Sequence, residues 1–348
     1  MKALVAGWFS FENGHATAGD LLTRDLACEW LRKAGLAYDI AVAPPFDDGV
    51  DLRSVNPADY SHAVFVCGPF EQGELEAEFF ERFGGCRLIG LNLSMRVPLE
   101  AWNPWDLLIE RDSSANAHPD MAFLSQRPHV PVVGVCLVEE YKGAMVAEAN
   151  AAIERLIGSR EMAVVAVDTR LDSNATGLRT PAEIESLIAR VDVMVTTRLH
   201  GTVLALKNGV PAVVIDPEAG GAKIRRQAET IGWPVVFNVD AVTDDVLQNA
   251  LTYCLSNDGR VKARECRDRA ISTLEVIRAQ FVKVLTQPEE LERAYDERIR
   301  ALAEHRVAAG TGQTSRSRSR HGVRTARDRV KKLVRSTQGL LRRVPRRM

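Results

Sequence analysis

The chain has 348 residues, of which 46% are hydrophobic and 26% charged, as is ordinary for a globular protein. No uninterrupted apolar run reaches about 18 residues, which excludes a membrane-spanning helix, and the length suggests two domains. The formal net charge of −1 hides an uneven distribution, because residues 306–348 hold fourteen Lys and Arg against one acid, Asp328. The rest of the chain is therefore acidic overall.

Short apolar runs and helical patterns alternate along the first 285 residues. The first series predicts strands at 2–8, 37–43, 62–68, 86–93 and 106–112 and helices at 18–35 and 74–84. The second series predicts strands at 130–138, 162–169, 192–197 and 211–216 and helices at 144–158, 181–191 and 201–209, with another helix after Gly221. Such alternation is typical of parallel sheets covered by helices on both faces.

The two series predict an α/β fold of two doubly wound, Rossmann-like domains, over residues 1–128 and 129–286, which face each other across a cleft. Ligands of such sheets bind beyond the carboxyl ends of the strands, so the cleft is the expected site. Residues 287–309 are predicted to form a charged helix. Residues 310–348 are predicted to form a flexible linker followed by a basic amphipathic helix.

The cysteines show neither a CxxC motif nor a His/Cys spacing typical of a metal site, so no metal is expected. The six are Cys28, Cys67, Cys86, Cys136, Cys254 and Cys266. Cys67 and Cys136 lie in apolar strand-like runs, where cysteine behaves as a small buried hydrophobe. We expect all six to be reduced, as in a cytosolic protein.

The segment TTRLHG places Arg198 and His200 at the carboxyl end of a buried strand, and Gly201 opens the next helix. A helix N-terminus favours an anion through its free N–H groups, and a guanidinium adds a fork for a carboxylate or phosphate. A histidine titrates near neutral pH and can donate a proton. The alternative is that Arg198 pairs with a carboxylate and His200 caps the helix.

Lys223 is a second cationic candidate, because it lies in the first turn of the helix after Gly220 and Gly221. A lysine at a helix N-terminus is mildly unfavourable unless it answers an anion. This position therefore indicates a phosphate site. The alternative is a solvated lysine beside Arg225 and Arg226.

Two loops in the first half supply further candidates for the cleft. The candidates are Asn13, His15, Gly19 and Asp20 from the loop after the first strand and Arg111 and Ser113 from the run after residue 110. A lone loop histidine is more often solvated, and Asp112 fits a helix cap better than a ligand contact. Because the GxGxxG fingerprint is absent, dinucleotide binding is not favoured.

Several of these motifs resemble the polysaccharide pyruvyl transferase family. TTRLHGTVLALKNGVPAVVID, with a lysine after it, resembles the family's Arg-Leu-His-Gly block, Ala/Leu-rich helix and Gly-Val-Pro strand. LIERDSSANAHPDMAFL resembles its Arg-Asp-x-x-Ser segment and the Pro-Asp-x-Ala-Phe after it. The early AGD resembles the end of its Gly-Asn-x-Gly-Asp element, and DYSHAVFVCGPF its Asp-then-Gly-rich strand end. Together these motifs cover roughly residues 1–240 in order.

The resemblance implies a fold similar to the two-domain GT-B glycosyltransferases. It also implies a reaction that moves the enolpyruvyl carbons of phosphoenolpyruvate onto two sugar hydroxyls as a ketal. His200 would be the general acid that protonates the methylene carbon of the donor. Arg198, Gly201 and Lys223 would hold its carboxylate and phosphate. A glycan or lipid-linked sugar would bind on the side of the N-terminal domain, and no further cofactor is implied.

The basic tail admits three interpretations. It would hold the enzyme on an anionic membrane surface, to which each Lys or Arg contributes about 1 kcal/mol, or serve as a nucleic-acid-binding arm, or be a solubilising extension. Nucleic acid is the least favoured partner. The first interpretation predicts a cytoplasmic enzyme that is peripheral on the inner face of the cell membrane.

Two rival functions stay open. The first is a GT-B glycosyltransferase that uses a nucleotide sugar, in which Arg198 and Lys223 would grip a diphosphate. The second is a non-catalytic member of the family that acts in glycan assembly.

Overall fold

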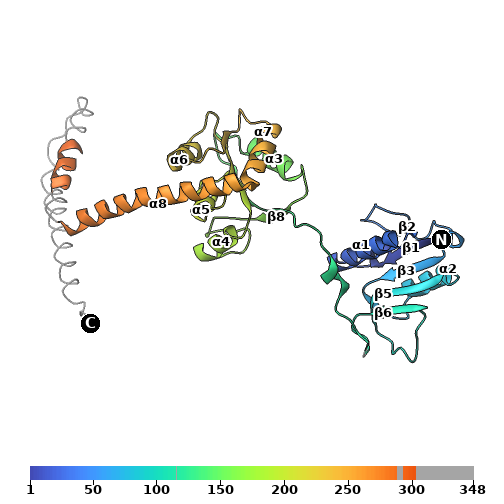
Figure 1. Ribbon diagram of the computed structural model, residues 1–348. Helices are drawn as coiled ribbons and strands as arrows, with labels where there is room; N and C mark the ends of the chain where they lie inside the picture. The colour runs from blue at the N-terminus through green and yellow to red at the C-terminus, as the bar shows by residue number, and fades with distance from the viewer. Residues whose placement is uncertain (115, 288–292, 303–348) are drawn as a thin grey trace, which may run out of the picture. The chain divides into compact units, whose positions relative to one another are not determined.

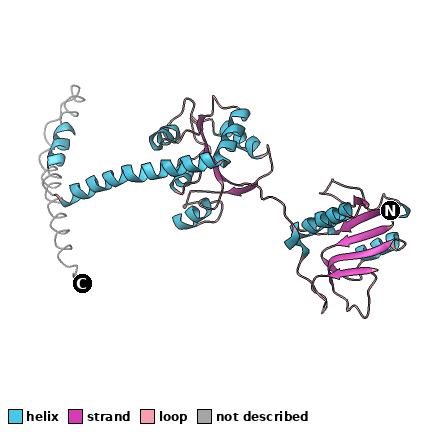
Figure 2. Cartoon of the chain, in the orientation of Figure 1, coloured by secondary structure: helices cyan, strands magenta, loops and turns pink. Residues whose placement is uncertain are grey.

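The computed structural model describes residues 1–114, 116–287 and 293–302 (Figure 1). The chain separates into two compact units, one over Met1–His129 and one from Val130 onward. In each unit helices surround a sheet whose paired strands run parallel (Figure 2). The predicted α/β class with two parallel sheets is therefore confirmed.

The first unit contains a six-stranded sheet in the order β2-β1-β3-β5-β4, with β6 beside β5. Its strands are β1 Lys2–Gly7, β2 Ala37–Ile40, β3 His62–Val66, β4 Pro69–Phe70, β5 Arg87–Met95 and β6 Leu107–Glu110. Its α-helices are α1 Ala18–Lys33 and α2 Glu74–Phe83, and short 3₁₀ turns lie at Trp8–Ser10, Pro57–Asp59 and Met121–Leu124.

Alternate residues of β1 enter two different cores, as the period of a strand requires. Leu4 belongs to an aromatic cluster with Phe65 and Phe79, the second of which comes from α2. Val5 belongs to a smaller cluster with Ala27 of α1. The sheet is therefore covered on both faces, which explains why its central strands are apolar along their whole length.

The second unit contains a five-stranded sheet in the order β11-β10-β9-β7-β8. Its strands are β7 Val132–Cys136, β8 Ala163–Ala166, β9 Val193–Thr196, β10 Ala212–Asp216 and β11 Val236–Asn238. Its helices are α3 Val146–Ile157, α4 Pro181–Ile188, α5 Leu199–Lys207, α6 Lys223–Ile231, α7 Asp244–Leu255 and α8 Asn257–Thr286. A single buried cluster joins the sheet to these helices.

Both sheets reverse their winding direction once. In the second unit the chain passes from β7 to β8 on one side and then crosses back to place β9 on the other side of β7. In the first unit the same reversal separates β1 from β3. Loops diverge at such a point and leave a crevice beyond the carboxyl ends of the two strands, where ligands of these sheets bind. The segment TTRLHG follows β9 and therefore lies at the reversal of the second sheet.

The start of α5 differs from the prediction. The predicted helix opens at Gly201, whereas α5 begins at Leu199 with Arg198 as its N-cap residue. His200 therefore lies inside the first helical turn and does not cap the helix. The segments of β4, β11, α7 and α8 contain short or weakly periodic apolar patterns, which predict no element.

The 30-residue helix α8 has two different halves. Near its start, Ala263 and Cys266 are buried against the second unit. Beyond them, the apolar side chains are exposed, with Leu274 at 59% and Phe281 at 64% of their full surface. Figure 1 shows this second half running clear of the sheet. The first half is therefore part of the core and the second half is not.

The predicted linker and basic tail, 310–348, lie outside the described residues, as does most of the predicted helix over 287–309. Of that helix, residues 293–302 are described and are helical. None of the helices in the described ranges combines the length and apolar character that crossing a bilayer requires. All six cysteines are free, and Cys67 and Cys136 are buried as predicted.

Candidate active site

The end of β9 is tied to the end of β7 by two buried threonines. The hydroxyl of Thr196 donates to the carbonyl of Cys136 at 2.6 Å and accepts from the backbone N–H of Arg198 at 3.0 Å. The hydroxyl of Thr197 donates to Asn150 at 3.2 Å and accepts from the N–H of Val138 at 2.9 Å. These bonds fix the position from which Arg198 leaves the sheet.

The guanidinium of Arg198 is enclosed and fully engaged. Its Nε donates to the carbonyl of Leu137 at 3.2 Å, its Nη2 to the carboxylate of Glu139, and its Nη1 lies 3.6 Å from Asp168 Oδ1. Only 13% of the side chain is exposed. The alternative that Arg198 pairs with a carboxylate is therefore confirmed. Its two carboxylate partners, Glu139 and Asp168, come from the loops after β7 and β8.

Glu139 also reaches a second arginine. Its Oε1 lies 3.3 Å from Nη1 of Arg170, whose other nitrogens bind Asp172 at 2.8 and 3.0 Å. The hydrogen bond from Arg198 is the main cause that lowers the pKa of Glu139 from 4.5 to about 2. Sequence reasoning missed Glu139, Asp168 and Arg170, because each stands in a loop without a recognisable motif.

His200 is exposed, and its ring makes no hydrogen bond or ion pair with any described residue. It lies two residues after Arg198, in the first turn of α5. No side chain caps this turn. Within the described residues, the imidazole therefore has no partner and the first N–H groups of α5 have no side-chain acceptor.

Gly201 is required by packing. A Cβ built on it would lie 2.3 Å from Thr196 Oγ1 and 3.2 Å from the Cβ of Cys136. The first turn of α5 thus rests directly on the ends of β7 and β9. The glycine is explained without a ligand, although its N–H belongs to the same uncapped turn.

Lys223 begins α6, as predicted, but the end of that helix is already occupied. The buried carboxylate of Asp216 accepts from the backbone N–H of Ala222 at 2.7 Å and of Arg225 at 2.9 Å. The side chain of Lys223 is exposed and lies 6.0 Å from the ring centre of Tyr141. An anion at Lys223 would therefore bind to the ammonium group, because Asp216 already accepts from N–H groups at this end of the helix.

One loop connects the two predicted cations. Residues 137–145 follow β7, and this loop brings Glu139 to Arg198 and Tyr141 to Lys223. The hydroxyl of Tyr141 donates to Glu218 at 3.2 Å, and the N–H of Met145 donates to the carbonyl of Pro217 at 2.8 Å. Arg198 and Lys223 are thus contacted by residues only two positions apart in one loop.

In the first unit, Asp20 is a structural residue. Its carboxylate accepts from the backbone N–H and the hydroxyl of Thr17 at 2.6 and 2.8 Å and closes a capping box at the start of α1. Gly19 lies in the same turn. Asn13 and His15 are exposed in the preceding loop, both with a left-handed backbone, at φ 63° and 56°.

Arg111 and Ser113 hold the ends of β5 and β6 together. Arg111 donates to Asp120 at 3.0 Å and to the Ser94 hydroxyl at 2.6 Å, and the Ser113 hydroxyl accepts from the N–H of Met95, also at 2.6 Å. The expectation that Asp112 caps a helix is wrong. No helix begins directly after it in the described residues, and its carboxylate instead accepts from Arg111 and from the Ser94 hydroxyl.

The buried Asn92 was not predicted. It interrupts the register of β5 with φ 61°, and its amide donates to Cys67 Sγ at 3.2 Å and accepts from the N–H of Met121 at 3.2 Å. Through Cys67, which contacts the carbonyl of Gly19 at 4.0 Å, it connects the starts of α1 and of the 3₁₀ turn at Met121. A single asparagine in a strand-like run gave no signal for this role.

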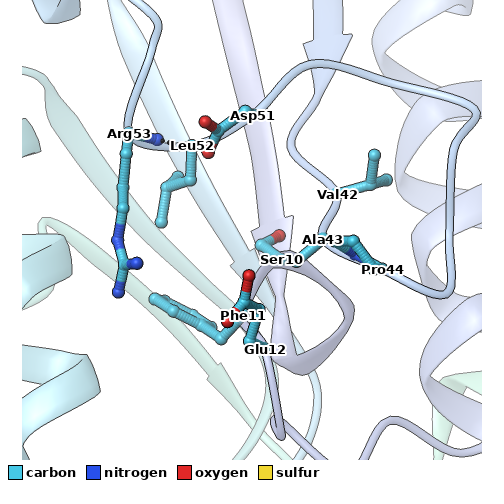
Figure 3. A pocket seen from close by; sticks show the side chains of 9 residues that line it. All are labelled: Ser10, Phe11, Glu12, Val42, Ala43, Pro44, Asp51, Leu52 and Arg53. Carbon is cyan, nitrogen blue, oxygen red and sulfur yellow. Dashed lines mark hydrogen bonds between the residues drawn. The ribbon is translucent and has the colours of Figure 1, made fainter.

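A cavity of about 240 Å³ opens elsewhere in the first unit, beside the loops that follow β1 and β2 (Figure 3). Its lining includes Ser10, Glu12, Pro44, Asp51 and Arg53. None of the predicted site residues lines it. The guanidinium of Arg53 is already paired with Glu78 at 2.7 Å. The cavity therefore gives no chemical indication of a ligand.

Comparisons with known proteins give one family match, which covers part of the chain. The family described as polysaccharide pyruvyl transferase matches residues 119–218. No curated protein matches the chain. Among solved structures, it is similar to the spinosyn rhamnosyltransferase SpnG with thymidine diphosphate, at 13% identity and a TM-score of 0.27, over 79% of this chain and 100% of that one.

It is also similar to the glycosyltransferase SnogD from Streptomyces nogalater, at 16% identity and a TM-score of 0.28, over 77% of this chain and 94% of that one. A UDP-GlcNAc 2-epimerase from Methanocaldococcus jannaschii with UDP-GlcNAc and UDP gives 11% identity and a TM-score of 0.26, over 79% and 100%. TM-scores this low support no conclusion about activity.

The matched segment contains Glu139, Arg170, Arg198, His200 and Gly201 and ends before Lys223. It therefore covers the loops after β7, β8 and β9 whose side chains meet at the reversal of the second sheet. Over residues 119–218 the resemblance to the polysaccharide pyruvyl transferase family that the motifs predict is thereby confirmed.

Proposed function

We propose that the chain is a pyruvyl transferase that moves the enolpyruvyl group of phosphoenolpyruvate onto a sugar of a cell-surface glycan or of its lipid-linked precursor. The product is a ketal, and phosphate is released. The family match over residues 119–218 supports a transferase of polysaccharide biosynthesis in general. The donor, the ketal and the acceptor are parts of the proposal.

In the proposed reaction, His200 protonates the methylene carbon of the donor, and the carbon that bears the carboxylate becomes cationic. A sugar hydroxyl adds to this carbon and loses its proton. The bond from the same carbon to the phosphate oxygen then breaks, and phosphate leaves with its electron pair. A second hydroxyl adds to the carbon and closes the ketal, and its proton passes to the departing phosphate. A positioned acid of this kind typically accelerates a reaction about 10²–10⁴-fold.

The observation that carries the proposal is the position of His200. Its exposed imidazole lies in an uncapped helical turn, two residues after a guanidinium, where the winding of the second sheet reverses. Ligands of such sheets bind at this kind of position. The free N–H groups of that turn favour an anion, and the family match includes this segment. Lys223, at the start of the next helix, supplies the further positive charge that a phosphate and a carboxylate require.

Phosphate release from phosphoenolpyruvate in the presence of candidate glycans tests the proposal. The full chain should release phosphate only with an acceptor, and His200→Ala should lose about 10²-fold or more of the rate. His200→Gln is the milder variant that keeps the helix surface polar. Full activity of both variants would remove His200 from the mechanism. Turnover of a nucleotide sugar without any phosphate release would instead establish a glycosyltransferase.

We further propose that the basic segment 306–348 holds the enzyme on an anionic membrane surface, where lipid-linked acceptors lie. Its fourteen Lys and Arg support the proposal through their charge alone. Flotation with vesicles that contain an anionic lipid should retain the full chain and release a chain ending at Ala309. Equal retention of both would contradict the proposal.

A further inference from the structure

Glu139 binds two arginines at once. One carboxylate oxygen accepts from Nη2 of Arg198 and the other lies 3.3 Å from Nη1 of Arg170. Proteins commonly bind carboxylate and phosphate ligands with the planar guanidinium groups of arginines. Glu139 is bound by two such groups in the same way. Glu139 thus occupies a place that has the geometry of an anion site.

The two arginines are fixed independently of Glu139. Arg198 is held by the carbonyl of Leu137 at 3.2 Å and by Asp168, and Arg170 by Asp172 at 2.8 and 3.0 Å. Removing Glu139 from between them would therefore leave both guanidinium groups in position, each with one N–H group free.

Of the two carboxylates that contact Arg198, Glu139 is the more easily displaced. Its side chain is 55% exposed, whereas those of Arg198 and Asp168 are 13% and 12% exposed. It also stands on the loop over residues 137–145, outside any helix or strand. The exposed position places it on the solvent side of the arginine pair, from which a small anion would approach.

The charge of the cluster explains why Glu139 must leave. The two arginines face three carboxylates, those of Glu139, Asp168 and Asp172, so the cluster is negative while Glu139 stays in place. An incoming anion would be repelled by this arrangement. With Glu139 displaced, the anion takes over its two hydrogen bonds.

We propose that Arg170 and Arg198 together bind a carboxylate or phosphate group, and that Glu139 is the internal anion which this group displaces. The assignment of that group to phosphoenolpyruvate rests on the proposed function. The site itself does not, because two fixed guanidinium groups bind any small oxyanion of suitable size.

Binding of inorganic phosphate and of phosphoenolpyruvate to the full chain, measured by calorimetry without an acceptor, tests the site. Glu139→Gln and Glu139→Ala should each bind both anions about fivefold more tightly, the factor that a half-exposed ion pair supplies. Arg170→Gln should bind them more weakly than the native chain. In the double variant, Arg170→Gln should cancel the gain from Glu139→Gln.

Arg155→Gln is the matched control, because Arg155 makes a similar exposed pair with Asp244 at 3.0 Å on the surface of the second unit. It should leave anion binding unchanged. Circular dichroism shows whether each variant is folded. If Glu139→Gln does not fold, Glu139→Ala provides the same test.

The outcomes separate the site from the proposed function. If folded Glu139 variants bind phosphate no more tightly than the native chain, the displacement is wrong, whatever the enzyme catalyses. If they bind phosphate more tightly but no glycan elicits phosphate release from phosphoenolpyruvate, the anion site stands and the proposed reaction fails. Unchanged binding in Arg170→Gln would remove Arg170 from the site.

Discussion

Gly201 lies so close to Thr196 that a Cβ built on it would stand 2.3 Å from the threonine hydroxyl oxygen. This contact sets the distance between the first turn of α5 and the end of β9. The position of His200 on that turn therefore depends on a residue that has no side chain.

Gly201→Ala should destabilise the second unit by about 1–3 kcal/mol, because the added methyl group overpacks a buried contact. The urea midpoint, followed by circular dichroism, measures the change. Gly19→Ala is the control, since Gly19 also lies in a first helical turn but its added Cβ would find only an ordinary contact at 3.6 Å. Equal midpoints for Gly201→Ala and the native chain would show that the turn can shift at no cost.

Asp216→Ala should cost roughly 1–3 kcal/mol, because it leaves two partly buried backbone N–H groups at the start of α6 without their acceptor. Hydrogen exchange at Ala222 and Arg225 should quicken relative to the rest of the helix. Asp240→Ala is the matched control, because Asp240 is exposed and accepts from the N–H of Gly220 in the same loop at 3.3 Å. Equal exchange in the two variants would contradict the capping role.

Stability should depend on Glu139 only above acidic pH. The Arg198 hydrogen bond lowers the pKa of this carboxyl from 4.5 to about 2, so its ionised form is favoured by folding. The contribution is therefore fully present above pH 4.5, the unfolded value, and is lost as the pH falls towards 2.

The difference in urea midpoint between the native chain and Glu139→Gln should accordingly be largest at pH 7 and shrink at pH 3. Glu140→Gln is the control, because Glu140 is the exposed neighbour and makes no ion pair with a described residue. A difference that stays constant from pH 7 to pH 3 would show that the pair does not form in solution.

The thiols should react slowly in the native protein. Burial raises the pKa of Cys28 to about 11 and that of Cys254 to about 12, so neither is a thiolate at pH 8. Alkylation by iodoacetamide, followed by mass spectrometry, should label both only after unfolding in urea. Rapid labelling of Cys254 in the folded chain would mean that the contact between α7 and α8 opens readily.

The sequence predicted the strands and helices with strong periodicity and the local order of TTRLHG, because these depend on neighbouring residues. It could not predict the partners of Arg198, since Glu139 and Asp168 are about 59 and 30 positions away and meet it only through the order of the sheet. The start of α5 was placed late for a related reason. Arg198 is an unusual N-cap residue, and Gly201 looked like a better start.

Asp216 shows the same limit in another form. It was predicted as the last residue of a strand, which is confirmed in β10, but the pattern gave no sign that its carboxylate organises the following helix. The long α8 escaped prediction because the apolar side chains of its second half are largely exposed, as the described residues show. The periodicity of apolar residues along a helix reflects which face is buried. A helix that extends beyond the core therefore lacks a regular apolar face over part of its length.

The length of the exposed half of α8 also determines the direction in which the chain leaves this helix. Thr286 lies twenty residues beyond Cys266, or about 30 Å along the helix axis, and each residue turns the helix by about 100°. Deleting one residue between them would rotate the exit of the chain to another side of the axis, whereas deleting seven would change it by only about 20°. Length changes in this half would therefore be tolerated by the fold of the second unit but would redirect whatever follows, with a period of seven residues.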